Sequence, residues 1–208
     1  MKPTEEKIFK TAIDLFSQKG YHGVSIREIA RAVGIKESSI YNHYSSKDRI
    51  LEAIFDYYKD QMNETGLSKE EMDDKIGTIS LEDFWTTGLS KFHKTTEDPL
   101  MEKINNIILL EMFRNVRARN LALKELFHRQ QMIVGKIFEK MQKRGMIKKG
   151  FDPKVLAVEF TYPLLGLRFE YNILKNWNLD TRIVQKKMMD HIKFISEIAK
   201  TADDLNEK

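Results

Sequence analysis

The sequence predicts an all-α protein, and three observations lead to that prediction. The chain has 208 residues but only ten glycines and four prolines, so residues that interrupt helices are widely spaced. Apolar residues recur at intervals of three, four and seven positions, which is the period of an amphipathic helix. Residues that commonly begin helices (Ser, Thr, Asn and the pair Asp-Pro) stand in front of these apolar stretches.

Three helices are expected at the N-terminus. The first begins near Thr4 and ends at Gly20, and the second begins at Ser25. Glu28 follows Ser25 by three residues, which is the spacing of a capping box. Gly34 tolerates the positive φ of a tight turn, so a short third helix is expected directly after it.

A fourth helix is expected from Lys47 to about Asn63, followed by a polar, acidic loop. Beyond the loop the apolar pattern predicts five more helices, over residues 81–96, 99–117, 121–144, 153–176 and 181–202. We therefore expect a small N-terminal head over residues 1–48 and a larger C-terminal helical domain over residues 49–208. The fourth helix would connect the two.

Composition and charge narrow the classes of function. Cysteine is absent, which excludes disulfides, thiolate metal sites and a cysteine nucleophile. The charged N-terminus lacks the apolar core of a signal peptide, and no apolar run approaches the ~18 residues of a membrane span, so a cytoplasmic protein without a membrane partner is expected. The net charge is +4, with nine basic against six acidic residues over 1–50. This balance permits nucleic-acid binding without demanding it.

The second and third helices have the pattern of a helix-turn-helix, whose second helix can enter the major groove of DNA. Apolar residues from Ile26 to Ile40 would pack between the two helices. The outward side chains of the third helix are short hydroxyls, an amide, a carboxylate and rings that can hydrogen-bond base edges. They are Glu37, Ser38, Ser39, Tyr41, Asn42 and His43. The cations that flank this helix are expected to reach phosphates. They are Arg27, Lys36 and Lys47.

Several of these residues also have a purely structural interpretation. Tyr41 would then be a half-buried ring on the first helix, and His43 would pack near Tyr44. Arg27 would be an ordinary surface charge. Glu37, at a helix N-terminus, is as well placed to complement the helix dipole as to meet a cytosine.

The run FSQKGYHGVSIREIARAVGIKESSIYNHYSSKDRILEAI resembles the DNA-binding head of the tetracycline-repressor (TetR) family. The matching features are Phe16, Gly20, Tyr21, the S-x-R-x-I-A pattern of residues 25–30, Gly34, Ile35, Ile40-Tyr41, His43-Tyr44 and Ser46-Lys47. The resemblance covers about the first quarter of the chain. One departure is Lys36, which opens the third helix where the family commonly has a capping serine.

The resemblance implies a homodimer whose two third helices read a palindromic operator in double-stranded DNA, with Tyr41 and Lys47 holding phosphates. It also implies a repressor that a small-molecule effector, bound in the C-terminal domain, releases from DNA. The residue pattern agrees with dimerisation, because Gly166 permits close approach of a neighbouring helix and the last predicted helix is apolar along one side. The alternative is a DNA-binding or interaction factor whose C-terminal domain only dimerises.

Aromatic and polar residues of the C-terminal domain are candidates for an effector pocket. They are Trp85, His93, Ile108, Phe113, Gln130, Glu159 and Tyr162. The aromatic residues among them would equally serve as core.

No motif of an enzyme, and no cofactor, is implied by the sequence. Glu125 and His128 form one E-x-x-H pair, the spacing used by di-iron bundles, but such sites need a second pair and the chain has none. A metal site is therefore not expected. Arg114, Arg117 and Arg119 are interpreted as a solvated basic edge, partly neutralised by the acidic segment over residues 51–100.

Overall fold

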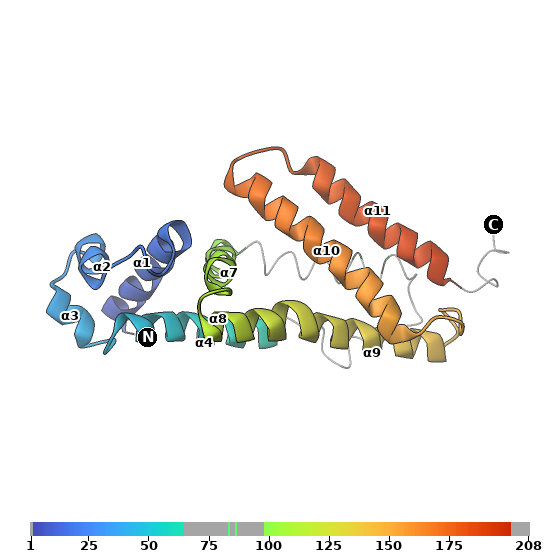
Figure 1. Ribbon diagram of the computed structural model, residues 1–208, viewed down its shortest axis with the longest axis horizontal. Helices are drawn as coiled ribbons and strands as arrows, with labels where there is room; N and C mark the ends of the chain where they lie inside the picture. The colour runs from blue at the N-terminus through green and yellow to red at the C-terminus, as the bar shows by residue number, and fades with distance from the viewer. Residues whose placement is uncertain (1, 65–82, 84–85, 87–97, 201–208) are drawn as a thin grey trace. The chain divides into compact units, whose positions relative to one another are not determined.

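The computed structural model describes residues 2–64, 83, 86 and 98–200, and in these residues the chain is helical (Figure 1). The α-helices are α1 (Pro3–Lys19), α2 (Ile26–Val33), α3 (Glu37–Tyr41), α4 (Lys47–Glu64), α7 (Pro99–Glu111), α8 (Val116–Leu121), α9 (Arg129–Lys143), α10 (Pro153–Asn176) and α11 (Arg182–Ala199). A π-helical turn over Ala122–His128 precedes α9. Helices of these lengths and order confirm the predicted all-α class. No helix in the described part is long and apolar enough to cross a membrane.

The chain divides into two compact units, Met1–Gly66 with Phe92–Phe127, and Leu67–Lys91 with His128–Lys208. The boundary expected after residue 48 lies inside the first unit, because α4 packs on α1, α7 and α8. A head over residues 1–48 that binds DNA stays a prediction. The acidic loop and most of the helix expected over residues 81–96 lie outside the described residues.

The first unit is built around α1, which packs against α2, α4 and α7. One face of α1 is almost completely buried. Its residues are Ile8, Phe9, Ala12, Ile13 and Phe16. These side chains continue into a core shared with α2, α3, α4, α7 and α8. The short helices α2 and α3 are therefore held by packing against a core that the longer helices α1, α4 and α7 largely form.

The helix-turn-helix forms as the sequence predicts. The Ser25 hydroxyl caps α2 by accepting the N–H of Glu28 at 3.2 Å. Gly34 ends α2 in the left-handed region with φ of 81°, a conformation that penalises a side chain. The N–H groups of Gly34 and Ile35 both donate to the carbonyl of Ala30, at 2.9 and 3.0 Å, which closes the turn before α3.

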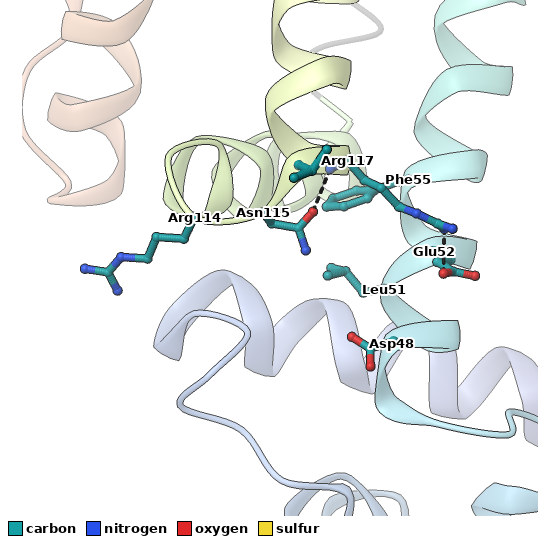
Figure 2. Close-up of a pocket in the computed structure, with 8 residues that line it drawn as sticks. Asp48, Leu51, Glu52, Phe55, Arg114, Asn115 and Arg117 are labelled. Atoms are coloured by element: carbon teal, nitrogen blue, oxygen red, sulfur yellow. Dashed lines mark hydrogen bonds and ion pairs between the residues drawn. The ribbon is translucent and has the colours of Figure 1, made fainter.

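The helix predicted over residues 99–117 is wrong in its last turn. It ends at Glu111, and a new helix, α8, begins at Val116. The reason is Asn115, whose side-chain oxygen accepts the N–H groups of Arg117 and Ala118 at 2.9 and 3.1 Å. The helix that the sequence predicts to begin at residue 121 therefore begins five residues earlier, at Val116, with its cap at Asn115 (Figure 2).

The second unit contains α9, α10 and α11, with α10 packed against both of the others. Asp152 caps α10 by accepting the N–H of Lys154 at 2.8 Å, as the Asp-Pro pair predicts. The core holds Phe138 and Phe160, whose rings meet edge to face at 5.8 Å between centroids. Figure 1 shows α10 and α11 side by side.

Large apolar side chains remain exposed along α10, α11 and the turn between them. They are Val155, Tyr162, Ile173, Trp177, Leu179, Ile183, Met189 and Phe194, and we call them the α10–α11 apolar face. Gly166 is exposed as well, and a side chain built there would meet no atom within 4 Å. Surfaces of this kind on a folded protein commonly mark an interaction site.

Candidate nucleic-acid interface

Helix α3 is anchored by one side chain and presents the others to solvent. Ile40 is completely buried in the core of the first unit. Around it, Lys36, Glu37, Ser38, Tyr41 and Asn42 are exposed, and Ser39 and His43 are partly exposed. Tyr41 is 53% exposed, so about half of its surface is accessible to a partner. The structure thus places all the groove-reading candidates on one short helix and the residues beside it.

The start of α3 is left without a side-chain cap. Lys36 occupies the N-cap position, and no side chain there bonds to the N–H groups of the first turn. Glu37, in that turn, lies with its Oε1 3.7 Å from the Nε of Arg27 on α2. Both side chains are largely solvated, so this contact contributes little to stability. Free N–H groups at a helix start, next to two cations, are suited to meet a phosphate.

Lys47, the other predicted phosphate contact, has protein partners in this structure. Its Nζ donates to the carbonyls of Tyr21 and Val24, at 2.9 and 2.8 Å. It also lies 4.1 Å from the centroid of the Tyr21 ring. An ammonium has three N–H donors, so these two bonds leave one. Lys47 therefore fixes the turn between α1 and α2 as well as carrying charge beside α3.

Tyr21 links this turn to two distant helices. Its hydroxyl donates to Oδ1 of Asp48 at 2.5 Å, at the start of α4. Its backbone N–H donates to Oε1 of Glu111 at 2.9 Å, at the end of α7. Burial, together with the bond to Asp48, raises the pKa of the Tyr21 hydroxyl well above its usual range. The hydroxyl is consequently neutral and acts as a donor at ordinary pH.

Glu111 connects α7 to the turn between α1 and α2, and no pattern in the sequence singles it out. It is only 4% exposed, and its second oxygen, Oε2, has no hydrogen-bond partner among the described residues. A buried carboxylate is retained at a cost unless its bonds compensate. Its bond to Tyr21 is therefore expected to contribute substantially to the position of the turn between α1 and α2.

Tyr44, just after α3, is buried, and its hydroxyl has no hydrogen-bond partner among the described residues. Burial, with a smaller effect from Glu5, raises the pKa of this hydroxyl to about 12. The tyrosines of an unfolded chain titrate near 10. As the pH rises above 10, the unfolded state loses its proton first. Tyr44 therefore lowers stability between about pH 10 and pH 12 and has no such effect below pH 10.

We expect Tyr44→Phe to leave the free energy of unfolding at pH 7 unchanged or to raise it by about 1 kcal/mol, because the substitution removes an unsatisfied buried hydroxyl. Above pH 10 the variant should lose less stability than the wild type. The matched control is Tyr21→Phe, which removes a satisfied hydroxyl and should lower stability at pH 7. Urea unfolding across this pH range measures both. Equal losses at pH 7 would show that the Tyr44 hydroxyl has a partner.

The residues expected to form an effector pocket lie in different surroundings. Trp85 and His93 are outside the described residues. Ile108 is fully buried in the core of the first unit, whereas Phe113 is 86% exposed. In the second unit Gln130 is partly exposed, and Glu159 and Tyr162 are exposed. A shared pocket for these residues stays a prediction.

The structure also describes the residues of the basic edge and of the E-x-x-H pair. Arg117 forms an ion pair with Glu52 of α4 at 2.6 Å, which is the neutralisation by the acidic segment that the sequence predicts. Glu125 is buried within the π-helical turn, and His128 is exposed at its end. The described residues contain no group of three or more side chains able to hold a metal ion.

A family model described as bacterial regulatory proteins of the tetR family matches residues 8–54. The chain is also 46% identical over 57 residues to IcaR, the negative transcriptional regulator of the biofilm operon icaADBC in Staphylococcus aureus; this is 26% of the chain and 31% of IcaR. It is 39% identical over 61 residues to the uncharacterised HTH-type regulator YuxN of Bacillus subtilis, 29% of the chain and 21% of YuxN. The matched region thus spans less than a third of the length of these two relatives.

The matched region contains α2, the turn and α3, so it includes every feature of the helix-turn-helix described above. Residues 8–54 are thus similar to the DNA-binding region of the TetR family. The two relatives named above are described as transcriptional regulators.

Solved structures of TetR-family proteins share the fold over nearly the whole chain. A TetR regulator from Chloroflexus aurantiacus matches with a TM-score of 0.71 and 22% identity, over 96% of this chain and 97% of that one. A putative transcriptional regulator from Saccharomonospora viridis in complex with choline matches with a TM-score of 0.65 and 20% identity, over 93% and 97%. At these identities the likeness shows the fold alone.

Proposed function

We propose that this TetR-family protein is a repressor that binds a palindromic operator as a homodimer and leaves it when a small molecule binds its C-terminal domain. The observation that carries the proposal is α3. One buried residue, Ile40, fixes the helix, and a continuous set of exposed polar side chains surrounds it. A short helix held in this way can enter a major groove without rearranging the core.

The roles of the α3 residues follow from their chemistry and position. Ser39 and Asn42 carry groups that hydrogen-bond base edges, and an Asn amide can pair with adenine. Lys36, Arg27 and the open N–H groups at the start of α3 would hold phosphates. These contacts fix the protein on the duplex but carry no sequence information. Glu37 would exchange its weak contact with Arg27 for a base or a water on binding.

Homodimerisation is supported by the α10–α11 apolar face. A second copy that covers this face would remove its apolar side chains from water, and each Å² removed contributes roughly 25 cal/mol. Gly166 lies open on α10, so a partner helix can approach its backbone closely. A two-fold axis through this face would present the heads as a symmetric pair, which matches a palindrome.

Release by an effector is supported by the relatives and by one structural link. The neighbour from Saccharomonospora viridis carries choline, so a fold of this kind can hold a small molecule. In the present chain Glu111 joins the end of α7 to Tyr21, at the base of the head. A ligand that moved α7 would therefore act directly on the turn that Lys47 also fixes. In the alternative, a C-terminal domain that only dimerises, this link would only stabilise the turn between α1 and α2.

The proposal is tested by selecting binding sites from a random DNA pool with the full chain. We expect a palindromic consensus for the wild type. Ser39→Ala and Asn42→Ala should each relax the consensus at one position per half-site, with a loss of about 1–3 kcal/mol there. Ser45→Ala, an exposed serine beyond α3, is the matched control and should leave the consensus intact. An unchanged consensus for both α3 variants would contradict direct readout by these residues.

A further inference from the structure

We propose that the acidic segment of this chain after α11, residues 201–208, docks on a basic surface at the end of α9 and shields that surface from polyanions. The surface belongs to the second unit, and it comprises the last turn of α9, the loop after it and the first turn of α10. We call its cations the α9–α10 basic surface. They are Lys140, Lys143, Arg144, Lys148, Lys149 and Lys154.

The α9–α10 basic surface carries a high charge for so short a stretch. Residues 140–154 contain six cations and one carboxylate, that of Asp152, which caps α10. All of the cations except Lys140 are exposed. The helix dipole favours cations in the last turn of α9, but it disfavours Lys154, which lies in the first turn of α10. Because these like charges lie close together, the surface attracts anionic groups.

The loop between α9 and α10 is fixed by contacts inside the second unit. The side-chain nitrogen of Gln142 donates to the carbonyls of Lys148 and Phe151, at 3.0 and 2.9 Å. Ile147 is buried in the core of this unit. The Nζ of Lys148 donates to the carbonyl of Ile198 on α11, at 3.1 Å. Since the loop backbone is already ordered, docking on it costs less conformational entropy.

The end of α11 directs the following residues toward this surface. Ile147 and Lys200 form an antiparallel bridge, and beside it the N–H of Lys148 donates to the carbonyl of Ala199 at 3.0 Å. In an antiparallel pair the two chains run in opposite directions. The chain therefore leaves Lys200 toward residues that precede the bridge on the other side, which are those of the last turn of α9.

The segment after Lys200 has the complementary charge. Residues 201–208 read TADDLNEK, with three carboxylates and one lysine. Asp203 and Asp204 follow Lys200 by three and four residues, so they lie at most about 14 Å from it along an extended chain. The covalent connection gives these carboxylates a high effective concentration at the surface.

The spacing of the opposite charges matches on the two sides of the bridge. Arg144 and Lys143 stand three and four residues before it. Asp203 and Asp204 stand three and four residues after it. Single exposed ion pairs are weak and are screened by salt. Docking therefore depends on both carboxylates together and weakens as the salt concentration rises.

A docked segment would limit binding of polyanions to the second unit. An uncovered basic surface binds nucleic acids without regard to sequence and with a strong dependence on salt. The segment neutralises part of this charge, so fewer phosphates can bind there. Docking does not depend on operator recognition by α3, and its test needs no DNA.

Docking is measured with a nitroxide spin label on Asn206→Cys in the isotope-labelled full chain. The chain has no cysteine of its own, so the label is attached at one site. We expect broadening of the amide signals of Lys143 and Arg144 to be at least about threefold stronger at low salt than at about 1 M salt, where charges are screened beyond about 3 Å. Asp203→Asn with Asp204→Asn, the neutral-segment variant, should show only the high-salt broadening at either salt concentration.

The matched control is Asp56→Asn with Asp60→Asn, which removes the same two charges from exposed positions of α4. In the labelled chain it should broaden like the wild type. Broadening that is equal at low and high salt would overturn the proposal, because the covalent connection alone would then explain it. The same holds if the neutral-segment variant keeps the low-salt broadening.

Shielding is measured as the affinity of the full chain for a short oligothymidylate at low salt. The neutral-segment variant should bind at least about threefold more tightly than the wild type. Lys143→Gln with Arg144→Gln, added to this variant, should cancel the gain. Lys186→Gln with Lys193→Gln, at exposed positions of α11, is the matched control and should retain it. Equal affinities of the wild type and the neutral-segment variant, or a gain that persists without Lys143 and Arg144, would overturn the shielding.

Discussion

Replacing Ile173 and Phe194 by glutamate should convert the proposed dimer into a monomer and lower operator affinity by at least about 100-fold. Both side chains belong to the α10–α11 apolar face, and they are 61% and 57% exposed. Glutamates there would have to be desolvated in a dimer interface, at a cost of several kcal/mol. A monomer also loses the gain from binding two half-sites through one linked molecule, which is about 10²–10⁴ in affinity.

Folding of the variant should be intact, because neither side chain contributes to the described core of the second unit. The matched control is Asn176→Glu with Gln185→Glu, which adds the same charge at exposed polar positions of the same helices. Sedimentation and operator titration, with circular dichroism to check folding, measure the effect. A variant that stays dimeric, or a monomer with full operator affinity, would contradict the proposed interface.

Glu111→Ala should lower the free energy of unfolding by about 2–3 kcal/mol. The substitution leaves the N–H of Tyr21 buried without an acceptor and removes a hydrogen bond to a charged group. Glu111→Gln keeps an acceptor oxygen in the same place. It also replaces Oε2, the carboxylate oxygen that has no hydrogen-bond partner among the described residues. The glutamine variant should therefore stay close to the wild type.

Urea unfolding of the two variants separates the hydrogen bond from the packing of the side chain. If the glutamine variant lost as much stability as the alanine variant, the contact to Tyr21 would not be the contribution of Glu111. Operator titration of the alanine variant extends the test to function. Its affinity should fall, since the turn that Glu111 holds also carries the acceptors of Lys47.

The helix-turn-helix could be predicted because its signals are local. A capping serine, a glycine in the turn and an apolar residue every three or four positions lie within 16 residues of each other, and each acts on its immediate neighbours. The exposure of Tyr41 and the burial of Ile40 follow from the same periodicity. The unexpected break after Glu111 had a local signal too, in Asn115, but the apolar pattern continues across it.

The hydrogen bond between Tyr21 and Glu111 could not be predicted in this way. Tyr21 and Glu111 are separated by 90 positions, and neither has a neighbour in sequence that indicates the other. The same holds for Lys47. Its charge indicates a phosphate contact, but its bonds to the carbonyls of Tyr21 and Val24 depend on how α4 packs against the turn between α1 and α2. The pocket residues illustrate a further limit, because apolar character alone does not distinguish the buried Ile108 from the exposed Phe113.

The central claim is that α3 of each protomer reads one major groove of a palindromic operator. Methylation protection of guanine N7 on the selected operator tests it most directly, because this atom faces the major groove. We predict two protected patches, related by the palindrome and centred one helical turn apart or a multiple of it, about 34–36 Å per turn. Asn42→Ala should weaken protection within both patches. A single patch, or guanine N7 atoms that stay unprotected across the operator, would contradict the account.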